Sequence, residues 1–204
     1  HTRAMGRLAC LVLLSGVLGV RGGVYDAWSH RAKIRFAGYD GDSTLTNFPV
    51  LVVLSTDIPG FRYSDFISPA DGADLRFAAA DELAELNYEI ETWDTNGNSY
   101  VWVQAPRIAG AGDFIYGYWG RDAGAAPCTT NGSTWNSAFS GVCHMQQINA
   151  PDATAFQNHG TAAGPVVSAA GMVGAGNFFN GESRINVAAT DLFRGSDDVT
   201  VEFW

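Results

Sequence analysis

The stretch Leu86–Pro106, LNYEIETWDTNGNSYVWVQAP, decides the fold. Two runs in which apolar and polar residues alternate flank the polar centre DTNGN at residues 94–98. Asn-Gly between alternating runs is the strongest short-range signal for a β-hairpin, because both central residues of a type I′ turn need a positive φ. The sequence therefore predicts two antiparallel strands joined by a two-residue turn at Asn96 and Gly97.

This turn fixes a register in which Trp93 faces Tyr100 and Glu91 faces Trp102, with Ile90 opposite Val103. Side chains alternate across a strand, so the hairpin has two faces. One is a core face, formed by Tyr88, Ile90, Thr92, Val101, Val103 and Ala105. The other, which we call the acidic-aromatic face, carries carboxylates, an amide and aromatic rings: Glu89, Glu91, Trp93, Tyr100, Trp102 and Gln104.

Further short strands indicate an all-β protein. They are predicted at residues 28–39, 48–55, 73–78 and 113–120, and the stretch 48–55 is apolar on both faces, as a central strand would be. With 24 glycines and only 16% charged residues, the composition suits short strands and turns better than helices. Strands at this spacing predict an antiparallel β-sandwich.

The start of the chain is typical of an export signal. Arg7 precedes the short apolar run Leu8–Val20, and small residues cluster at 19–23. A membrane span needs about 20 apolar residues, so this run fits a secretory signal peptide better. We predict a signal peptide at residues 1–23, with a membrane anchor or a buried strand as alternatives. The mature protein would then be extracellular, on the cell surface or periplasmic.

Charge and hydropathy narrow the range of partners. Residues 1–23 contain three arginines and no acid, so their removal changes the net charge from −9 to −9 − 3 = −12. Such a surface argues against nucleic acid, whose phosphates need a basic footprint. Beyond the leader no apolar run is long enough to span a membrane. The partners we expect are an extracellular glycan or a cell-surface protein.

Two cysteines follow the leader, Cys128 and Cys143. An even number of cysteines in an exported protein favours a disulfide, which would contribute about 3 kcal/mol through chain entropy; two free buried thiols are the alternative. Because the composition becomes rich in Gly and Ala at 121–127, we place a domain boundary within 121–143. The predicted parts are a β-sandwich domain at 24–127, a disulfide-closed linker at 128–143 and a second domain at 144–204.

A series of short motifs runs through residues 28–120: Trp28, Arg31, Ile34, LTNFPVLV at 45–52, Phe61, DF at 65–66, GADLRF at 72–77, YEIETW at 88–93, VWV at 101–103, Pro106 and YWG at 118–120. In these motifs the segment resembles a bacterial family of exported proteins, the domain-of-unknown-function 2341 family. The resemblance implies no biochemical role. It implies an exported, multidomain protein in which this domain lies beside lectin-like sandwiches or, in some members, is joined to proton-channel proteins of the MotA/TolQ/ExbB type.

A second series of motifs lies in residues 143–204: His144-Met145, Asp152, QNHGT at 157–161, Gly174-Ala175, Phe178, Phe179-Asn180-Gly181 and VTVEFW at 199–204. In these motifs the segment resembles the beginning of a concanavalin A-like lectin/glucanase domain of the laminin-G-like type, which implies a partial jelly-roll sandwich. In that family an aromatic residue, usually Trp, often precedes the His-Met pair; Cys143 takes this place here, so a disulfide would replace a packing anchor. Related domains often hold calcium, and Asp152–His159 could line a cation site without giving a definite ligand set. We expect no other cofactor and assign no metal ligand.

The acidic-aromatic face allows three interpretations. Aromatic side chains in sheets more often pack than bind. Exposed rings beside carboxylates and an amide are also the chemistry of a sugar site. Glu89 and Glu91, about 6.6 Å apart along a strand, could serve a glycosidase, although alternating acids on a strand are common. We expect a non-enzymatic module for glycan binding or adhesion, with no catalytic residue; the alternative is a structural extracytoplasmic domain of a MotA/TolQ/ExbB-type transport assembly, and a glycoside hydrolase is third.

Overall fold

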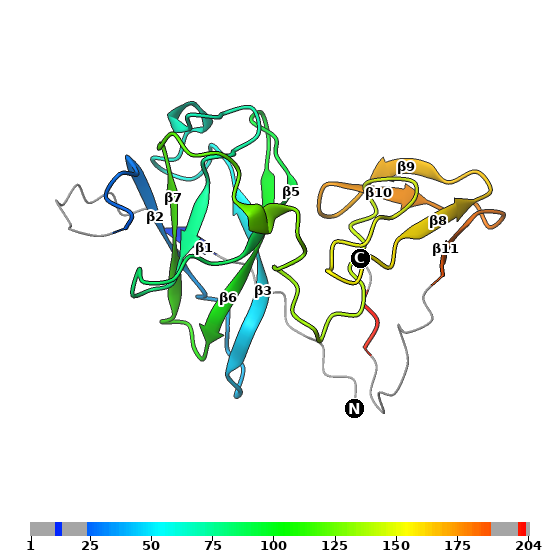
Figure 1. Ribbon diagram of the computed structural model, residues 1–204, viewed down its shortest axis with the longest axis horizontal. Helices are drawn as coiled ribbons and strands as arrows, with labels where there is room; N and C mark the ends of the chain where they lie inside the picture. The colour runs from blue at the N-terminus through cyan, green and yellow to red at the C-terminus, as the bar shows by residue number, and fades with distance from the viewer. Residues whose placement is uncertain (1–10, 14–23, 189–199, 203–204) are drawn as a thin grey trace. The chain divides into compact units, whose positions relative to one another are not determined.

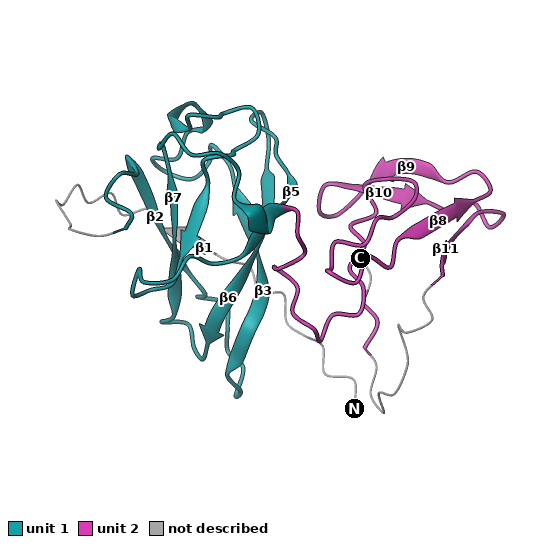
Figure 2. Ribbon diagram, in the orientation of Figure 1, with its two compact units in different colours: residues 1–129 teal, residues 130–204 magenta. Residues whose placement is uncertain are grey.

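The computed structural model describes residues 11–13, 24–188 and 200–202, and the chain divides into two compact units, residues 1–129 and 130–204 (Figures 1 and 2). Regular structure is almost entirely β, with antiparallel pairing throughout the described strands. The predicted all-β class is therefore confirmed, and each unit is described by itself below.

Unit 1 is a sandwich of two antiparallel sheets. Sheet A has the order β1-β2-β7-β4, and sheet B has the order β3-β6-β5. Two short 3-10 helices, η1 and η2, lie in the connections. The bounds are β1 Leu11–Leu13, β2 His30–Arg35, β3 Leu45–Leu54, η1 Tyr63–Asp65, β4 Arg76–Ala78, β5 Tyr88–Thr92, β6 Ser99–Ile108, β7 Phe114–Trp119 and η2 Pro127–Thr129.

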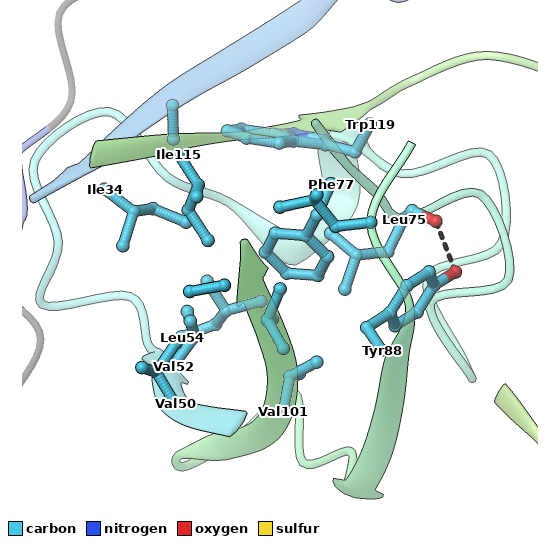
Figure 3. Close-up of a cluster of buried hydrophobic side chains, with 14 of the residues drawn as sticks. Ile34, Val50, Val52, Leu54, Leu75, Phe77, Tyr88, Val101, Ile115 and Trp119 are labelled. Atoms are coloured by element: carbon cyan, nitrogen blue, oxygen red, sulfur yellow. Dashed lines mark hydrogen bonds between the residues drawn. The ribbon is translucent and has the colours of Figure 1, made fainter. Parts of the chain in front are cut away.

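The core of unit 1 fills the space between its two sheets (Figure 3). Alternate residues of each strand point inward, which is how two packed sheets share one core. Tyr88 is fully buried, and its hydroxyl donates a hydrogen bond to the Leu75 carbonyl at 2.5 Å. Other buried members are Ile34 and Ile115 from sheet A, Val50, Val52, Val101 and Val103 from sheet B, and Phe77 from β4.

Strand β3 lies at an edge of sheet B, so the prediction of a central strand at 48–55 is wrong. The central strand is β6, which pairs with β3 on one side and with β5 on the other. The outward residues Leu51 and Val53 are half-buried rather than covered. Pro49, which has no N–H to offer, and the left-handed backbone of Asn47 at φ 48° make the free edge of β3 a poor partner for another strand.

Strands β5 and β6 form the predicted hairpin, but their register differs by two positions from the prediction. Val103 lies opposite Tyr88 instead of Ile90, and Val101 lies opposite Ile90. Over Tyr88–Ile90 this shift of two positions keeps the paired side chains on their predicted faces, because the side-chain period of a strand is two. Thr92, predicted on the core face, is the exception, because it lies opposite the outward-facing Tyr100. A bulge between Ile90 and Thr92 takes up part of the difference toward the turn.

The turn of this hairpin is also not the predicted type I′ turn. Neither Asn96 nor Gly97 has a positive φ. Instead, the Asp94 carboxylate accepts the N–H of Asn96 at 2.9 Å, and the Ser99 hydroxyl accepts the N–H of Asp94 at 2.9 Å. Aspartate commonly bonds to the backbone two residues on, and this Asx turn produces a six-residue loop, 93–98, between the strands.

The loop between β3 and β4 is held by one buried carboxylate, that of Asp74, which has no exposed surface. Its oxygens accept the N–H groups of Ile67 at 3.1 Å, Ser68 at 2.9 Å and Gly120 at 2.8 Å. Three N–H donors offset the cost of burying a carboxylate. Asp74 therefore fastens residues 67–74 to the chain that leaves β7.

Three residues of the predicted signal peptide form a strand in the structure. β1, Leu11–Leu13, pairs antiparallel with β2, with Leu11 opposite Arg35 and Leu13 opposite Lys33. The rest of the predicted leader, 1–10 and 14–23, lies outside the described residues, and the signal peptide stays a prediction. None of the helices in the described part of the chain has the length and apolar character that a membrane crossing needs.

Unit 2 contains two separate pairs of antiparallel strands. β8, Gly160–Ala163, pairs with β11, Arg184–Val187, and β9, Val167–Ala170, pairs with β10, Ala175–Phe178. Of the stretch VTVEFW at 199–204, which carries part of the laminin-G-like resemblance, residues 200–202 form no strand, and 199, 203 and 204 lie outside the described residues. The laminin-G-like jelly roll therefore stays a prediction.

Candidate functional site

The outer face of sheet B carries five of the six residues predicted for the acidic-aromatic face. Their neighbours Val101 and Val103 are fully buried in the core, so alternation directs the intervening side chains of β6 outward. All five are half-buried, which leaves part of each side chain open to solvent: Glu89, Glu91, Tyr100, Trp102 and Gln104.

Polar contacts orient the side chains of this face. The indole N–H of Trp102 donates a hydrogen bond to the Glu91 carboxylate across the two strands. At the other end, the side-chain amide of Asn87 donates to the Gln104 oxygen at 3.3 Å. A hydrogen bond to a charged oxygen is stronger than a neutral one, so the Trp102 ring has a preferred orientation.

Strand β3 adds an apolar margin that the sequence analysis did not assign to this face. Leu51 lies opposite Trp102 and Val53 lies opposite Tyr100 in the β3–β6 ladder. The face is therefore three strands wide, with acids on β5, aromatic rings on β6 and aliphatic side chains on β3. Because FPVLVVLS at 48–55 is apolar on both faces, the sequence already predicted aliphatic side chains on the outer side of this strand. The assumption that both faces were covered kept them out of the predicted site.

Trp93 does not join the other five residues. Its ring packs edge-on against Tyr63, at 5.2 Å between ring centroids, and against Phe66 at 5.1 Å. Its indole N–H donates to the Pro69 carbonyl at 2.9 Å. Gly72 lies so close that a Cβ there would be 2.6 Å from the Trp93 ring. Trp93 is therefore a packing residue that covers one end of the core.

The two cysteines are free thiols, so the predicted disulfide is not formed in this structure. Cys128 packs against the core of unit 1, and burial raises the pKa of its thiol. Cys143 pairs with Asp152 in an isolated β-bridge of unit 2, and burial raises the pKa of its thiol too. A raised pKa disfavours the reactive thiolate, which is the behaviour of a structural cysteine.

The segment proposed for a cation is organised around Asp152, whose carboxylate accepts hydrogen bonds from the chain itself. The donors are the N–H groups of Val142 at 2.8 Å, Thr154 at 3.0 Å and Asn158 at 2.8 Å, together with the Thr154 hydroxyl at 2.7 Å. His159 accepts the N–H of Asp152 through Nδ1 at 3.0 Å. Four N–H and O–H donors of the chain thus contact this carboxylate, and calcium in unit 2 stays a prediction.

The stability of unit 2 is expected to fall in acid because of Asp152. Burial acts to raise the pKa of this carboxyl, but the hydrogen bonds from Val142, Thr154 and Asn158 bring it below its ordinary value. A group with a lowered folded pKa stabilises the fold above its unfolded pKa, about 3.9, and this stability disappears as pH falls through the folded pKa. Amide hydrogen exchange in strands β8 and β11 between pH 6 and 2.5 would measure this.

Asp152→Asn provides the control for that experiment. This substitution should lower the protection of the β8 and β11 amides against exchange at neutral pH. It should also make that protection depend less on pH, because the titrating carboxyl is gone. Equal pH profiles for Asp152→Asn and the wild type would show that another carboxyl is responsible.

Unit 1 is thus a two-sheet antiparallel sandwich with a half-exposed acidic-aromatic outer face. Residues 71–146 match the family described as Domain of unknown function (DUF2341), a range that runs from just before β4 through β7 and η2 into the first part of unit 2. This supports the family resemblance of the first domain. Comparison with curated proteins and with solved structures gives no match. Within the described residues no group of three or more His, Cys, Asp or Glu side chains could hold a metal ion.

Proposed function

We propose that unit 1 is a non-enzymatic module of an exported protein and binds an uncharged glycan on the acidic-aromatic face. One observation carries the proposal: Tyr100 and Trp102 lie two positions apart on the central strand of sheet B, half-exposed, with Glu91 holding the Trp102 indole. The proposal concerns five residues, because Trp93 packs against the core.

The chemistry of these side chains suits a sugar. Aromatic rings offer flat apolar surfaces to the C–H groups of a pyranose, and Tyr100 and Trp102 are spaced about 6.6–7 Å apart along the strand. Glu89 and Gln104 bring oxygen atoms that accept hydrogen bonds from sugar hydroxyls. Two carboxylates on one face repel a polyanion, which is why an uncharged glycan is proposed.

Removing either ring should weaken binding without unfolding the domain. Trp102→Ala and Tyr100→Ala are each expected to lower affinity for the best uncharged oligosaccharide about 10- to 30-fold, as for aromatic residues at the centre of an interface. A glycan array would identify the oligosaccharide, and isothermal titration calorimetry would measure each variant.

Phe156→Ala is a matched control, because Phe156 is an aromatic residue of unit 2 with 56% of its surface exposed. It should bind as the wild type does, and circular dichroism should show the same β content in all variants. The proposal fails if the wild type binds no uncharged glycan, or if Trp102→Ala and Phe156→Ala bind equally well.

The same samples test the glycosidase alternative. A binding module should release no reducing sugar from the polysaccharide that it binds. Cleavage by the wild type that disappears in Glu91→Gln would replace the binding proposal with a hydrolytic one, because a carboxylate at that position would then be needed for chemistry rather than for holding Trp102.

A further inference from the structure

The outer face of sheet A carries a second set of outward side chains. Ala32 and Ile34 are buried, so Arg31, Lys33 and Arg35 of β2 point to the opposite side of the sheet. In the same way the buried Ile115 leaves its neighbours in β7 on that outer side. We call this the cationic-aromatic face: Arg31, Lys33, Arg35, Phe114, Tyr116 and Tyr118.

Each of two cations on this face lies over a ring of the neighbouring strand. The Lys33 Nζ atom is 3.5 Å from the centre of the Phe114 ring, and the Arg31 guanidinium carbon is 4.5 Å from the centre of the Tyr116 ring. Such cation–π contacts contribute a modest interaction free energy, and they restrict the positions of long flexible side chains. The positive charges are therefore presented from fixed positions.

One end of this face is closed by the chain that precedes β2. Tyr25 stacks on Tyr118 with 4.4 Å between ring centroids, and Trp28 packs beside them. Glu82 accepts hydrogen bonds from Arg31 and from the Tyr118 hydroxyl. The open end is formed by Lys33, Arg35, Phe114 and Tyr116, all of which are half-buried.

The two outer faces of the sandwich therefore carry opposite charge. β2 presents cations at every second position, and β5 presents the carboxylates of Glu89 and Glu91 at the same two-residue spacing, about 6.6–7 Å. Aromatic rings lie beside the charges on both faces, on β7 and on β6. Tyr, Trp, Phe and Arg are the residues that protein interfaces favour.

We propose that the cationic-aromatic face of one copy docks on the acidic-aromatic face of a second copy. Lys33 and Arg35 would lie against Glu89 and Glu91, and the rings of Phe114 and Tyr116 would pack against Tyr100 and Trp102. Each copy uses two different surfaces, so the association is head-to-tail and can continue from copy to copy. This inference does not rest on glycan binding, although a glycan on the acidic-aromatic face would compete with it.

The association is reversible and weak, because exposed ion pairs contribute little and the chain has a net charge of −9. Sedimentation velocity of the 204-residue chain in about 0.15 M salt, where the Debye length is about 8 Å, should show the mean mass rising with concentration. In about 1 M salt the rise should be much smaller, because the Debye length is then about 3 Å.

Charge reversal separates this docking from non-specific aggregation. Lys33→Glu with Arg35→Glu makes both faces acidic, and Glu89→Lys with Glu91→Lys makes both faces basic. Each double variant alone should associate at least about tenfold more weakly than the wild type. An equimolar mixture of the two should associate again, since each then meets a face of opposite charge.

Matched controls change the net charge equally at exposed positions elsewhere: Arg62→Glu with Arg184→Glu, and Asp42→Lys with Asp57→Lys. A mixture of these two control variants should associate no more strongly than either variant does alone. A wild type that stays monomeric at about 1 mM, or reversed variants that do not recover on mixing, would overturn the proposal. Loss of docking with intact glycan binding in Lys33→Glu/Arg35→Glu would separate this proposal from the one above.

Discussion

Trp93→Ala is expected to lower the free energy of unfolding of unit 1 by about 3 kcal/mol, while glycan binding at Trp102 keeps its affinity. The ring of Trp93 packs edge-on against Tyr63 and Phe66, and its N–H donates to the Pro69 carbonyl at 2.9 Å. Truncation removes these contacts and leaves a cavity beneath the loop that carries Gly72.

Urea unfolding, followed by fluorescence and by circular dichroism, measures this effect, and Trp102→Ala is its counterpart. Trp102 is half-buried on the outer face, so its truncation should cost only about 1 kcal/mol of stability but most of the binding. Trp93→Ala should therefore lower mainly the stability, whereas Trp102→Ala should lower mainly the affinity for the glycan. If Trp93→Ala kept wild-type stability but lost glycan binding, Trp93 would belong to the acidic-aromatic face. That result would contradict the packing described above.

Asp74→Ala is expected to have the largest effect on folding, a loss of about 4 kcal/mol from unit 1. The substitution leaves the N–H groups of Ile67, Ser68 and Gly120 without their acceptor. The three bonds are part-buried, and a donor that is left without its acceptor away from water costs more than the net value of the hydrogen bond that is lost. Asp74→Asn keeps one acceptor oxygen and should lose about half as much.

Asp71→Ala is the control for this measurement. Asp71 is exposed in the same loop, and its carboxylate accepts the N–H of Ala73 at 3.0 Å, so its loss should cost about 1 kcal/mol or less. Hydrogen exchange should show the amides of Ile67, Ser68 and Gly120 losing protection together in Asp74→Ala. Equal stability of the Asp71 and Asp74 variants would show that the carboxylate does not fasten this loop.

The hairpin shows which predictions hold without a structure. Alternation placed Tyr88, Val101 and Val103 inside and Tyr100 and Trp102 outside, and the structure agrees. The register was wrong by two positions, because Asp94 and Ser99 form a longer loop that competes with the Asn-Gly turn. A register error of two positions changes which residues are opposite each other but not the side of the sheet on which they lie. The outward direction of Tyr100 and Trp102 was therefore predicted correctly although the turn was not.

Contacts between distant segments could not be predicted in this way. Trp93 alternates with the outward residues in the sequence, but the bulge before Thr92 and the loop 93–98 end the alternation there, and Pro69 and Phe66 receive the ring. The buried Asp74 gives no sequence signal for its three N–H donors. β3 is an edge strand because β6 pairs with β3 on one side and with β5 on the other, and this strand order is not visible in the sequence of β3.

By itself, the sequence determined that this chain is all-β and that Tyr88, Val101 and Val103 of the hairpin face the core, because the alternation of apolar residues is a local property of the backbone. Only the tertiary structure decided the order of the strands, the place of Trp93 and the presence of two oppositely charged outer faces. The cationic-aromatic face joins β2 to β7 across about eighty residues of sequence, at Lys33 and Phe114 for example. Pairing at that distance depends on the packing of the whole sandwich, and no local pattern encodes it.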